Sequence, residues 1–287
     1  MARDGFLRAC RREPVHPTPI WLMRQAGRYL PQYREVRRRL GLFDIIRRPD
    51  VCAEVTCQPV ELLGVDAAIL FSDISVAFAG MGVEFELREQ VGPVVARPLR
   101  GAADVEALRP VVPEADVPYL VEAVRLACER LSVPLIGFAG GPFTLASYLI
   151  EGGPSRRFLA TKRFMMSDPG LWAALMERLT DACVALLRAQ VRAGASAVQV
   201  FDSWVGVLSP ADFDEFVAPH VRRLFEQLRP LQVPAIYFGV ETGGLLERMR
   251  ETGASVLGVD WRTDLAAARR RLGGAVALQG NLDPATL

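Results

Sequence analysis

Short apolar segments alternate with amphipathic helical stretches along the whole chain, and this alternation constrains the fold more than any other feature. Seven segments have the length and apolar content of buried strands, and stretches with helical periodicity separate them. Repeated strand–helix units with apolar strands are typical of a parallel sheet covered by helices. The expected strands are residues 20–23, 67–71, 134–138, 197–201, 235–238, 255–259 and 275–279. The clearest expected helices are residues 119–131, 171–193, 210–228 and 265–272.

Seven strand–helix units indicate an α/β fold, a (β/α)8 barrel of the TIM type that lacks its eighth strand in this chain. Residues 82–97 break the rhythm, because they alternate and turn at Gly92-Pro93, and they predict a β-hairpin inserted after the second strand. A doubly wound open sheet is the competing fold. It requires a glycine-rich phosphate-binding turn after the first strand, and the sequence has none there. We therefore expect one barrel domain over residues 1–287.

Composition excludes several classes of function. The net charge of +1 gives no general attraction to nucleic acid or to a membrane surface. The N-terminus lacks a signal-peptide core and no apolar run reaches the ~18 residues of a membrane span, so we expect a soluble, cytoplasmic protein. The five cysteines follow no metal-binding spacing and are interpreted as buried, reduced thiols. His16 and His220 are the only histidines, which argues against a metal site and against a Ser-His-Asp triad.

Two arginines follow the first apolar segment directly. Arg24 and Arg28 flank Gln25-Ala26-Gly27, where the backbone is expected to bend. A guanidinium can hold a carboxylate through two hydrogen bonds, so this pair predicts a site for an anionic ligand with several carboxylates. The alternative interpretation is that arginine is simply abundant on the surface of this chain.

Catalytic residues of parallel barrels lie at the carboxyl ends of the strands, which directs attention to the segments after the second, third and fourth expected strands. Asp73 follows a very apolar strand and is either a fixed negative charge in a pocket or a cap for the next helix. The Gly140-Gly141-Pro142 turn starts a helix whose N–H groups either bind an anion or simply initiate the helix. Tyr148 lies on that helix and reads by default as core, and Ser203 places a hydroxyl at the rim after the fourth strand.

Five segments together resemble the uroporphyrinogen decarboxylase family, in the family's order and over nearly the whole chain. They are Trp21-Leu-Met-Arg-Gln-Ala-Gly-Arg-Tyr-Leu-Pro-Gln-Tyr-Arg34, Phe71-Ser-Asp-Ile74, Gly137-Phe-Ala-Gly-Gly-Pro-Phe-Thr-Leu-Ala-Ser-Tyr148, Phe201-Asp-Ser-Trp204 and Gln279-Gly-Asn-Leu-Asp-Pro284. The resemblance implies a distorted (β/α)8 barrel, a homodimer, and no metal or organic cofactor. It also implies a lyase of haem and tetrapyrrole biosynthesis that removes four acetate carboxyls from uroporphyrinogen III as CO2, giving coproporphyrinogen III.

The resemblance also implies roles for individual residues. Arg24 and Arg28 are expected to hold substrate carboxylates, and Asp73 to accept hydrogen bonds from the pyrrole N–H groups; these three are the expected catalytic residues. The remaining expected substrate contacts are Gln25, Ala26, Gly27, Phe43, Tyr148 and Ser203. A substrate with eight carboxylates explains why an almost neutral chain concentrates arginines in one loop.

Two alternatives remain open at this point. Family members continue through an eighth strand and a substrate-contacting histidine, whereas this sequence ends at Leu287, so a non-catalytic remnant that binds porphyrinogens is one alternative. The other is a zinc-dependent methyltransferase on the related barrel. That chemistry needs a His-x-Cys pair after a late strand, and no cysteine follows Cys183.

Overall fold

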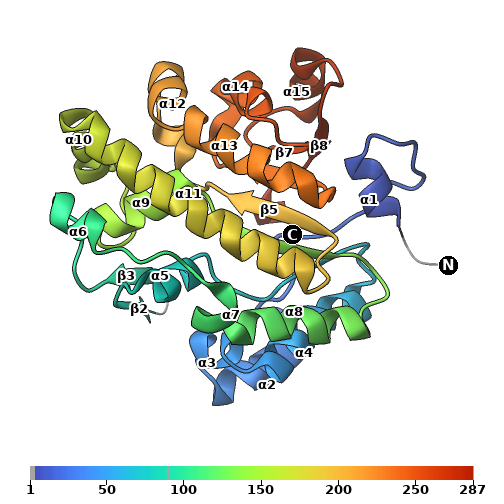
Figure 1. The fold of residues 1–287 in the computed structure, drawn as a ribbon. Helices are drawn as coiled ribbons and strands as arrows, with labels where there is room; N and C mark the ends of the chain where they lie inside the picture. Colours follow the sequence, from blue (N-terminus) through green and yellow to red (C-terminus); the bar gives the residue numbers. More distant parts are fainter. Residues whose placement is uncertain (1–3, 89–90, 287) are drawn as a thin grey trace.

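A curled parallel sheet forms the centre of the computed structural model, which describes residues 4–88 and 91–286 (Figure 1). Six strands lie in the order in which they occur along the chain, and every neighbouring pair is parallel. They are β1 (Ala68–Ile69), β4 (Leu135–Gly140), β5 (Ala197–Phe201), β6 (Ala235–Phe238), β7 (Val256–Gly258) and β8 (Ala277–Gln279). A doubly wound sheet reverses its strand order at one point, and this sheet does not. The expected barrel-type α/β fold is therefore confirmed, in the form of a half-barrel.

Helices cover the outer face of this sheet (Figure 1). The N-terminal half contains α1 (Gly5–Cys10), α2 (Pro31–Arg39), α3 (Leu42–Ile46), α4 (Pro49–Leu63), α5 (Val76–Met81), α6 (Ala102–Glu106), α7 (Pro113–Asp116) and α8 (Pro118–Arg130). The rest contains α9 (Pro142–Glu151), α10 (Leu159–Ser167), α11 (Pro169–Arg192), α12 (Pro210–Phe216), α13 (Ala218–Leu228), α14 (Leu246–Glu251) and α15 (Leu265–Leu272). Within the described residues, no helix is both long and apolar enough to cross a membrane.

The segment at residues 20–23, expected as the first strand, is not a strand. Its backbone donors are taken by side chains: the N–H of Ile20 donates to Asp66 Oδ2 at 2.8 Å, and the N–H of Leu22 donates to Gln25 Oε1 at 3.1 Å. Pro19 has no N–H to offer to a ladder. The segment still lies beside the sheet, because the carbonyl of Ile20 accepts a hydrogen bond from the N–H of Asp66.

The expected helix at residues 210–228 is two helices. The first, α12, ends at Phe216, and Val217 has a φ of −124° before α13 begins at Ala218. Pro219 explains the break, because inside a continuous helix its ring would clash with the carbonyl four residues earlier and one N–H donor would be missing. The new helix starts with this proline in its first turn, where the missing donor costs nothing.

The two faces of the sheet pack against different partners. Outward residues such as Val198, Val200 and Tyr237 belong to the large core shared with the helices. Inward residues such as Ile136 and Ile236 form a second, smaller core. Phe6 of α1 joins this inner core, so α1 packs into the sheet's inner face.

The expected hairpin is present as an antiparallel pair, β2 (Phe85–Arg88) with β3 (Gly92–Val95). It is anchored to α9, because the N–H of Val95 donates to the carbonyl of Gly152 at 2.8 Å. Gly152 ends α9 with a φ of +84°, a conformation that glycine adopts without strain. The hairpin thus lies over the end of the helix that carries Tyr148.

Candidate active site

The loop that carries Arg24 and Arg28 is held from inside by Gln25. The Gln25 side chain is 1% exposed, and its Nε2 donates to the carbonyl of Ala67 at 3.1 Å while its Oε1 accepts from Leu22. The hydroxyl of Tyr29 donates to the carbonyl of Gln25. Arg24 and Arg28 are exposed. The Gln25 side chain therefore points into the protein, and only its backbone can contribute to the surface of the loop.

Arg34 also supports this loop, and sequence reasoning did not single it out. Its Nη1 donates to the carbonyl of Arg28 at 2.9 Å and to the carbonyl of Tyr29 at 3.1 Å. Gly27 permits the tight bend, since a Cβ at this position would lie 2.8 Å from Cε1 of Tyr29. An arginine one turn into the helix after Pro31 was the available signal, but arginines are too frequent in this sequence to make it specific.

Asp73 follows β1 and is half-buried. Its Oδ1 accepts hydrogen bonds from the N–H of Ser75 at 2.9 Å and from the Ser75 hydroxyl. These bonds form the turn that leads into α5, whose N-cap is Ser75, so the Asp73 side chain supports this turn but does not cap the helix as the alternative interpretation expected. An ionised carboxylate accepts several hydrogen bonds, and Ser75 engages one of its two oxygens. Support of this turn and ligand binding are compatible in this geometry.

Tyr148 lies within reach of the charges of Asp73 and Arg24. The pKa of the Tyr148 phenol is raised to about 12, chiefly by burial and also by the Asp73 charge, while the Arg24 charge opposes the shift. The phenol is therefore protonated at neutral pH and can donate a hydrogen bond. A Cβ on Gly92 would lie 3.6 Å from the Tyr148 hydroxyl oxygen, so this oxygen faces the turn of the hairpin. The structure thus places Tyr148, a contact implied only by the family resemblance, near two of the expected catalytic residues.

A row of aromatic rings runs from α3 to the loop after β5, past Tyr148. Ring centroids are 5.3 Å apart for Phe43 and Phe85, 5.6 Å for Phe85 and Phe78, 6.5 Å for Phe78 and Tyr148, and 4.1 Å for Tyr148 and Trp204. We call these residues the aromatic row. Phe43 is thus connected to Tyr148 through the hairpin residue Phe85. The sequence offered no signal for this packing, because it depends on where the hairpin folds.

The carboxylate of Asp202 already binds an N–H group at the helix start formed by Gly140-Gly141-Pro142. The carboxylate of Asp202 accepts a hydrogen bond from the N–H of Thr144 at 2.8 Å, in the first turn of α9. This fits the interpretation of the turn as a helix start. Sequence reasoning treated Asp202 only as a neighbour of Ser203, whereas it is a fully buried residue that caps α9. Ser203 is half-buried, and its carbonyl accepts from the N–H of Val240 at 3.3 Å.

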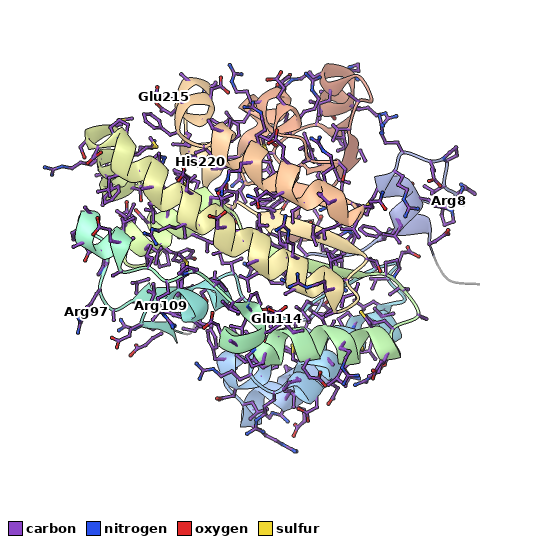
Figure 2. All side chains as sticks on the ribbon, viewed as in Figure 1. Arg8, Arg97, Arg109, Glu114, Glu215 and His220 are labelled. Carbon is purple, nitrogen blue, oxygen red and sulfur yellow. The ribbon has the colours of Figure 1, made fainter. Side chains whose placement is uncertain are left out.

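His220 lies on α13 and is half-buried (Figure 2). Burial lowers its pKa, and the charge of Glu177 on α11 opposes that shift. Exposed side chains of both signs, among them Arg97 and Glu215, are spread over the surface of the protein (Figure 2). Over residues 4–88 and 91–286, no three or more His, Cys, Asp or Glu side chains are grouped in a way that could hold a metal ion.

Comparison with known proteins gives consistent results. A family model described as Uroporphyrinogen decarboxylase (URO-D) matches residues 1–287. A uroporphyrinogen decarboxylase of Thermus thermophilus is 57% identical over 287 residues, which is 100% of this chain and 84% of that protein. One from Streptomyces griseus is 55% identical over 285 residues, 99% of this chain and 78% of that protein. A solved methyltransferase from Methanosarcina mazei has a TM-score of 0.78 at 20% identity, covering 98% of this chain and 82% of that one.

The fold and the site define an α/β enzyme of the barrel type, with charged and aromatic groups at the carboxyl ends of parallel strands. The methyltransferase supports this fold only, since its identity to the chain is 20%. The family model and the relatives match the chain along its length. The chain belongs to the uroporphyrinogen decarboxylase family.

Proposed function

We propose that this chain is a carboxy-lyase that converts uroporphyrinogen III into coproporphyrinogen III in haem and tetrapyrrole biosynthesis. Each of four acetate side chains takes up one proton and releases CO2, leaving a methyl group. The observation that carries the proposal is the family match over the whole chain, together with the charges of Arg24 and Asp73 that lie within reach of Tyr148. Neither the methyltransferase nor the porphyrinogen-binding remnant is favoured by these relatives.

The chemistry needs a cation to be stabilised and a carboxylate to be oriented. Protonation of a pyrrole carbon next to the acetate makes a cationic ring, and this ring accepts the electron pair released when the carbon–carbon bond to CO2 breaks. In the proposed arrangement Asp73 accepts hydrogen bonds from the pyrrole N–H groups and stabilises that cation, in a half-buried place where water screens little. Arg24 and Arg28 hold carboxylates of the substrate.

The other proposed contacts complete the binding surface. Tyr148, protonated at neutral pH, donates a hydrogen bond to a substrate carboxylate, and Ser203, next to Trp204 of the aromatic row, offers a hydroxyl. Phe43 forms part of an apolar wall, and the backbone of Gln25, Ala26 and Gly27 lines the loop. We assign no metal and no organic cofactor to the reaction.

Assembly and location are further parts of the proposal. We propose that the chain forms one barrel-type domain, acts as a homodimer and resides in the cytoplasm. Family membership supports these assignments, and sedimentation equilibrium tests the second. The expected mass is twice the 31.5 kDa of one chain, and a single-chain mass at micromolar concentration would reject the dimer.

Anaerobic incubation with uroporphyrinogen III tests the function. The products are separated by carboxyl count, with the Thermus thermophilus relative as a positive control for the assay. We expect intermediates with seven, six and five carboxyls and a final product with four. Uroporphyrinogen that binds but stays unchanged would instead support the non-catalytic remnant.

Asp73→Asn tests the role of the carboxylate. We expect loss of turnover by at least about 100-fold, the scale on which single groups that stabilise transition-state charge act, with the fold retained by circular dichroism. Asp214→Asn is the matched control, because Asp214 is exposed and pairs with Arg248 on the outside of the protein. Wild-type turnover in Asp73→Asn would remove Asp73 from the mechanism.

A further inference from the structure

A fully buried carboxylate joins three elements beneath the proposed site. Asp202 directly follows β5 and is 0% exposed. Its Oδ1 accepts hydrogen bonds from the N–H of Thr144 at 2.8 Å and from the Thr144 hydroxyl at 2.7 Å. Its Oδ2 accepts from the hydroxyl of Tyr237, on β6, at 3.1 Å. Asp202 therefore ties β5, β6 and the first turn of α9 together.

The connection continues from Thr144 to two proposed substrate contacts. Thr144 Oγ1 accepts a hydrogen bond from the N–H of Trp204 at 3.1 Å, so the start of α9 is bound to the loop that also carries Ser203. Tyr148 follows Thr144 by about one helical turn and lies on the same side of α9. The Trp204 ring packs on the Tyr148 ring, with centroids 4.1 Å apart. A continuous set of contacts thus leads from Asp202 to Tyr148 and to Ser203.

The surroundings of Asp202 leave it little freedom to move. A Cβ on Gly141 would lie 2.4 Å from the Cβ and Cγ of Asp202, so the helix start lies directly against the carboxylate. Burial raises the pKa of Asp202 to about 6, while the hydrogen bonds from Thr144 and Tyr237 act to lower it. Three hydrogen bonds to one fully buried carboxyl group, from two different elements, make this a stiff tie.

We propose that Asp202 is a positioning residue: through Thr144 and Trp204 it fixes the position of Tyr148 on α9 relative to Ser203 in the loop after β5. The inference rests on the proposed function, because it assigns those two residues to the substrate. Asp202 itself does not touch the substrate. It acts by holding the start of α9 against the loop after β5.

Substitutions at Thr144 test the tie without touching the charge or the substrate. Thr144→Val keeps the size of the side chain and removes the hydroxyl bond to Asp202 and the acceptor for Trp204, while the backbone N–H of residue 144 still donates to Asp202. Thr144→Ser retains the hydroxyl. Thr180→Val is the matched control, because Thr180 is also buried and its hydroxyl has no hydrogen-bond partner among the described residues. Each variant is combined with Tyr148→Phe in a double-mutant cycle on kcat/KM.

We expect Thr144→Val to lower kcat/KM about 10- to 100-fold, as a misplaced contact does, and Thr144→Ser and Thr180→Val to stay near wild type. If Thr144 acts through Tyr148, the fold-loss of kcat/KM in the double variant is smaller than the product of the fold-losses in Thr144→Val and Tyr148→Phe. A general loss of stability would instead lower activity by the same factor in both backgrounds. A fold-loss of kcat/KM in the double variant equal to the product of the two single fold-losses would overturn the proposal.

A readout that needs no turnover separates this inference from the proposed function. Trp204 fluorescence, isolated by subtracting a Trp204→Phe background, reports the packing of Trp204 on Tyr148. We expect its emission to shift in Thr144→Val and to be restored in Thr144→Ser. If the wild type is inactive but the emission shifts in Thr144→Val, the proposed function is rejected and the tie is retained. If the emission does not shift in Thr144→Val, the tie itself is rejected.

Discussion

At the scale of single residues, the geometry of arginine matters as much as its charge in the loop at residues 24–28. Arg24→Lys keeps the charge but loses the planar fork that grips a carboxylate with two hydrogen bonds. Hydrogen bonds to charged groups contribute about 1.5–3 kcal/mol, so we expect kcat/KM for uroporphyrinogen to fall roughly 10- to 100-fold, mainly through KM. Arg39→Lys, on the exposed face of α2, is the control. Steady-state kinetics with equal losses in both variants would contradict a specific role for Arg24.

The buried Asp202 predicts a pH dependence of stability. Its folded-state pKa is raised from 3.8 to about 6, so the folded chain binds a proton more tightly than the unfolded chain. The stability contribution is full below pH 3.8 and is lost as pH rises through about 6. At about 1.4 kcal/mol per pKa unit, the loss is roughly 3 kcal/mol.

Urea unfolding of wild type and Asp202→Asn between pH 4 and 7.5 measures this loss. We expect the wild-type free energy of unfolding, relative to that of Asp202→Asn, to decrease across this range. The subtraction removes the contribution of the other carboxylates, which titrate in both chains. A constant difference between the two chains would contradict a raised pKa for Asp202.

Residue positions were more predictable from the sequence than side-chain directions. The rule that chemistry follows strand ends selected Arg24 and Asp73, the family resemblance added Tyr148, and Tyr148 lies within reach of the charges of the other two. The same rule could not indicate that the Gln25 side chain turns inward to Ala67 or that Asp202 caps α9. Those directions follow from hydrogen-bond partners far away in the sequence, which no local pattern contains.

At the scale of secondary-structure elements, the hairpin is more than a surface insertion. Phe85 of β2 lies between Phe43 and Phe78 in the aromatic row. Phe85→Ala removes both contacts, and because Phe85 is half-buried we expect a loss of about 2 kcal/mol, less than for a fully buried phenylalanine. Glu86→Ala, on the opposite face of the same strand, is expected to be nearly neutral. Chemical denaturation measures both, and equal effects would show that the row does not support the hairpin.

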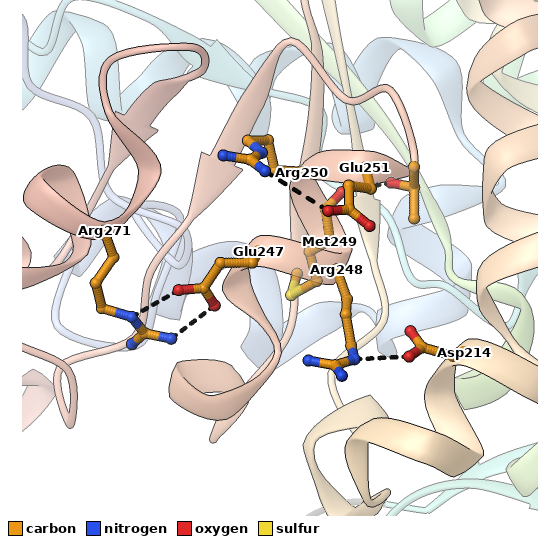
Figure 3. Close-up of polar contacts among 8 residues, drawn as sticks. Asp214, Glu247, Arg248, Met249, Arg250, Glu251 and Arg271 are labelled. Atoms are coloured by element: carbon orange, nitrogen blue, oxygen red, sulfur yellow. Dashed lines mark hydrogen bonds and ion pairs between the residues drawn. The ribbon is translucent and has the colours of Figure 1, made fainter.

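Ion pairs join the helices of the C-terminal half from outside. Arg271 of α15 forms two bonds with Glu247 of α14, at 2.8 and 2.7 Å, and Arg248 of α14 bonds Asp214 of α12 at 2.8 Å (Figure 3). These side chains are largely exposed, so each pair contributes between 0 and about 1 kcal/mol. Packing of the apolar helix faces accounts for most of the stability in this region.

Element boundaries were predictable where local chemistry decides them. The helix expected at residues 265–272 is found as α15, bounded by the Asp264 cap and by Gly273 with a φ of +64°. The strand expected at residues 20–23 was wrong, because an apolar run does not reveal that Asp66 and Gln25 take its donors. A helix cap depends on residues next to it in the sequence and can be predicted from them. A strand forms only when a partner strand, distant in the sequence, lies beside it.

At the scale of the whole molecule, the alternation of strands and helices was sufficient to predict the architecture. With each parallel strand next to its predecessor, the sheet curls in one direction; helices such as α11 and α13 cover its outer face, and α1 packs on its inner face. The small inward residues Ala197 and Ala277 allow this curl, since Phe6 and Trp21 fill the space over the inner face. The sequence could not predict that contact, because α1 and the first strand of the sheet are separated along the chain by α2, α3 and α4.

The same architecture predicts how the thiols react. Cys10, Cys52, Cys57 and Cys183 are buried, as expected from the sequence, and Cys128 is half-buried. Burial raises the pKa of Cys10 and Cys52 to about 12 and that of Cys57 to about 11, so almost no thiolate is present at pH 8. With Ellman's reagent at pH 8 we expect five thiols to react rapidly in guanidinium chloride and at most Cys128 in the native chain. Cys128→Ser is the control that should remove the fast native phase. If two or more thiols of the native chain reacted at the denatured rate, the helical layer would have to open far more readily than its packing allows.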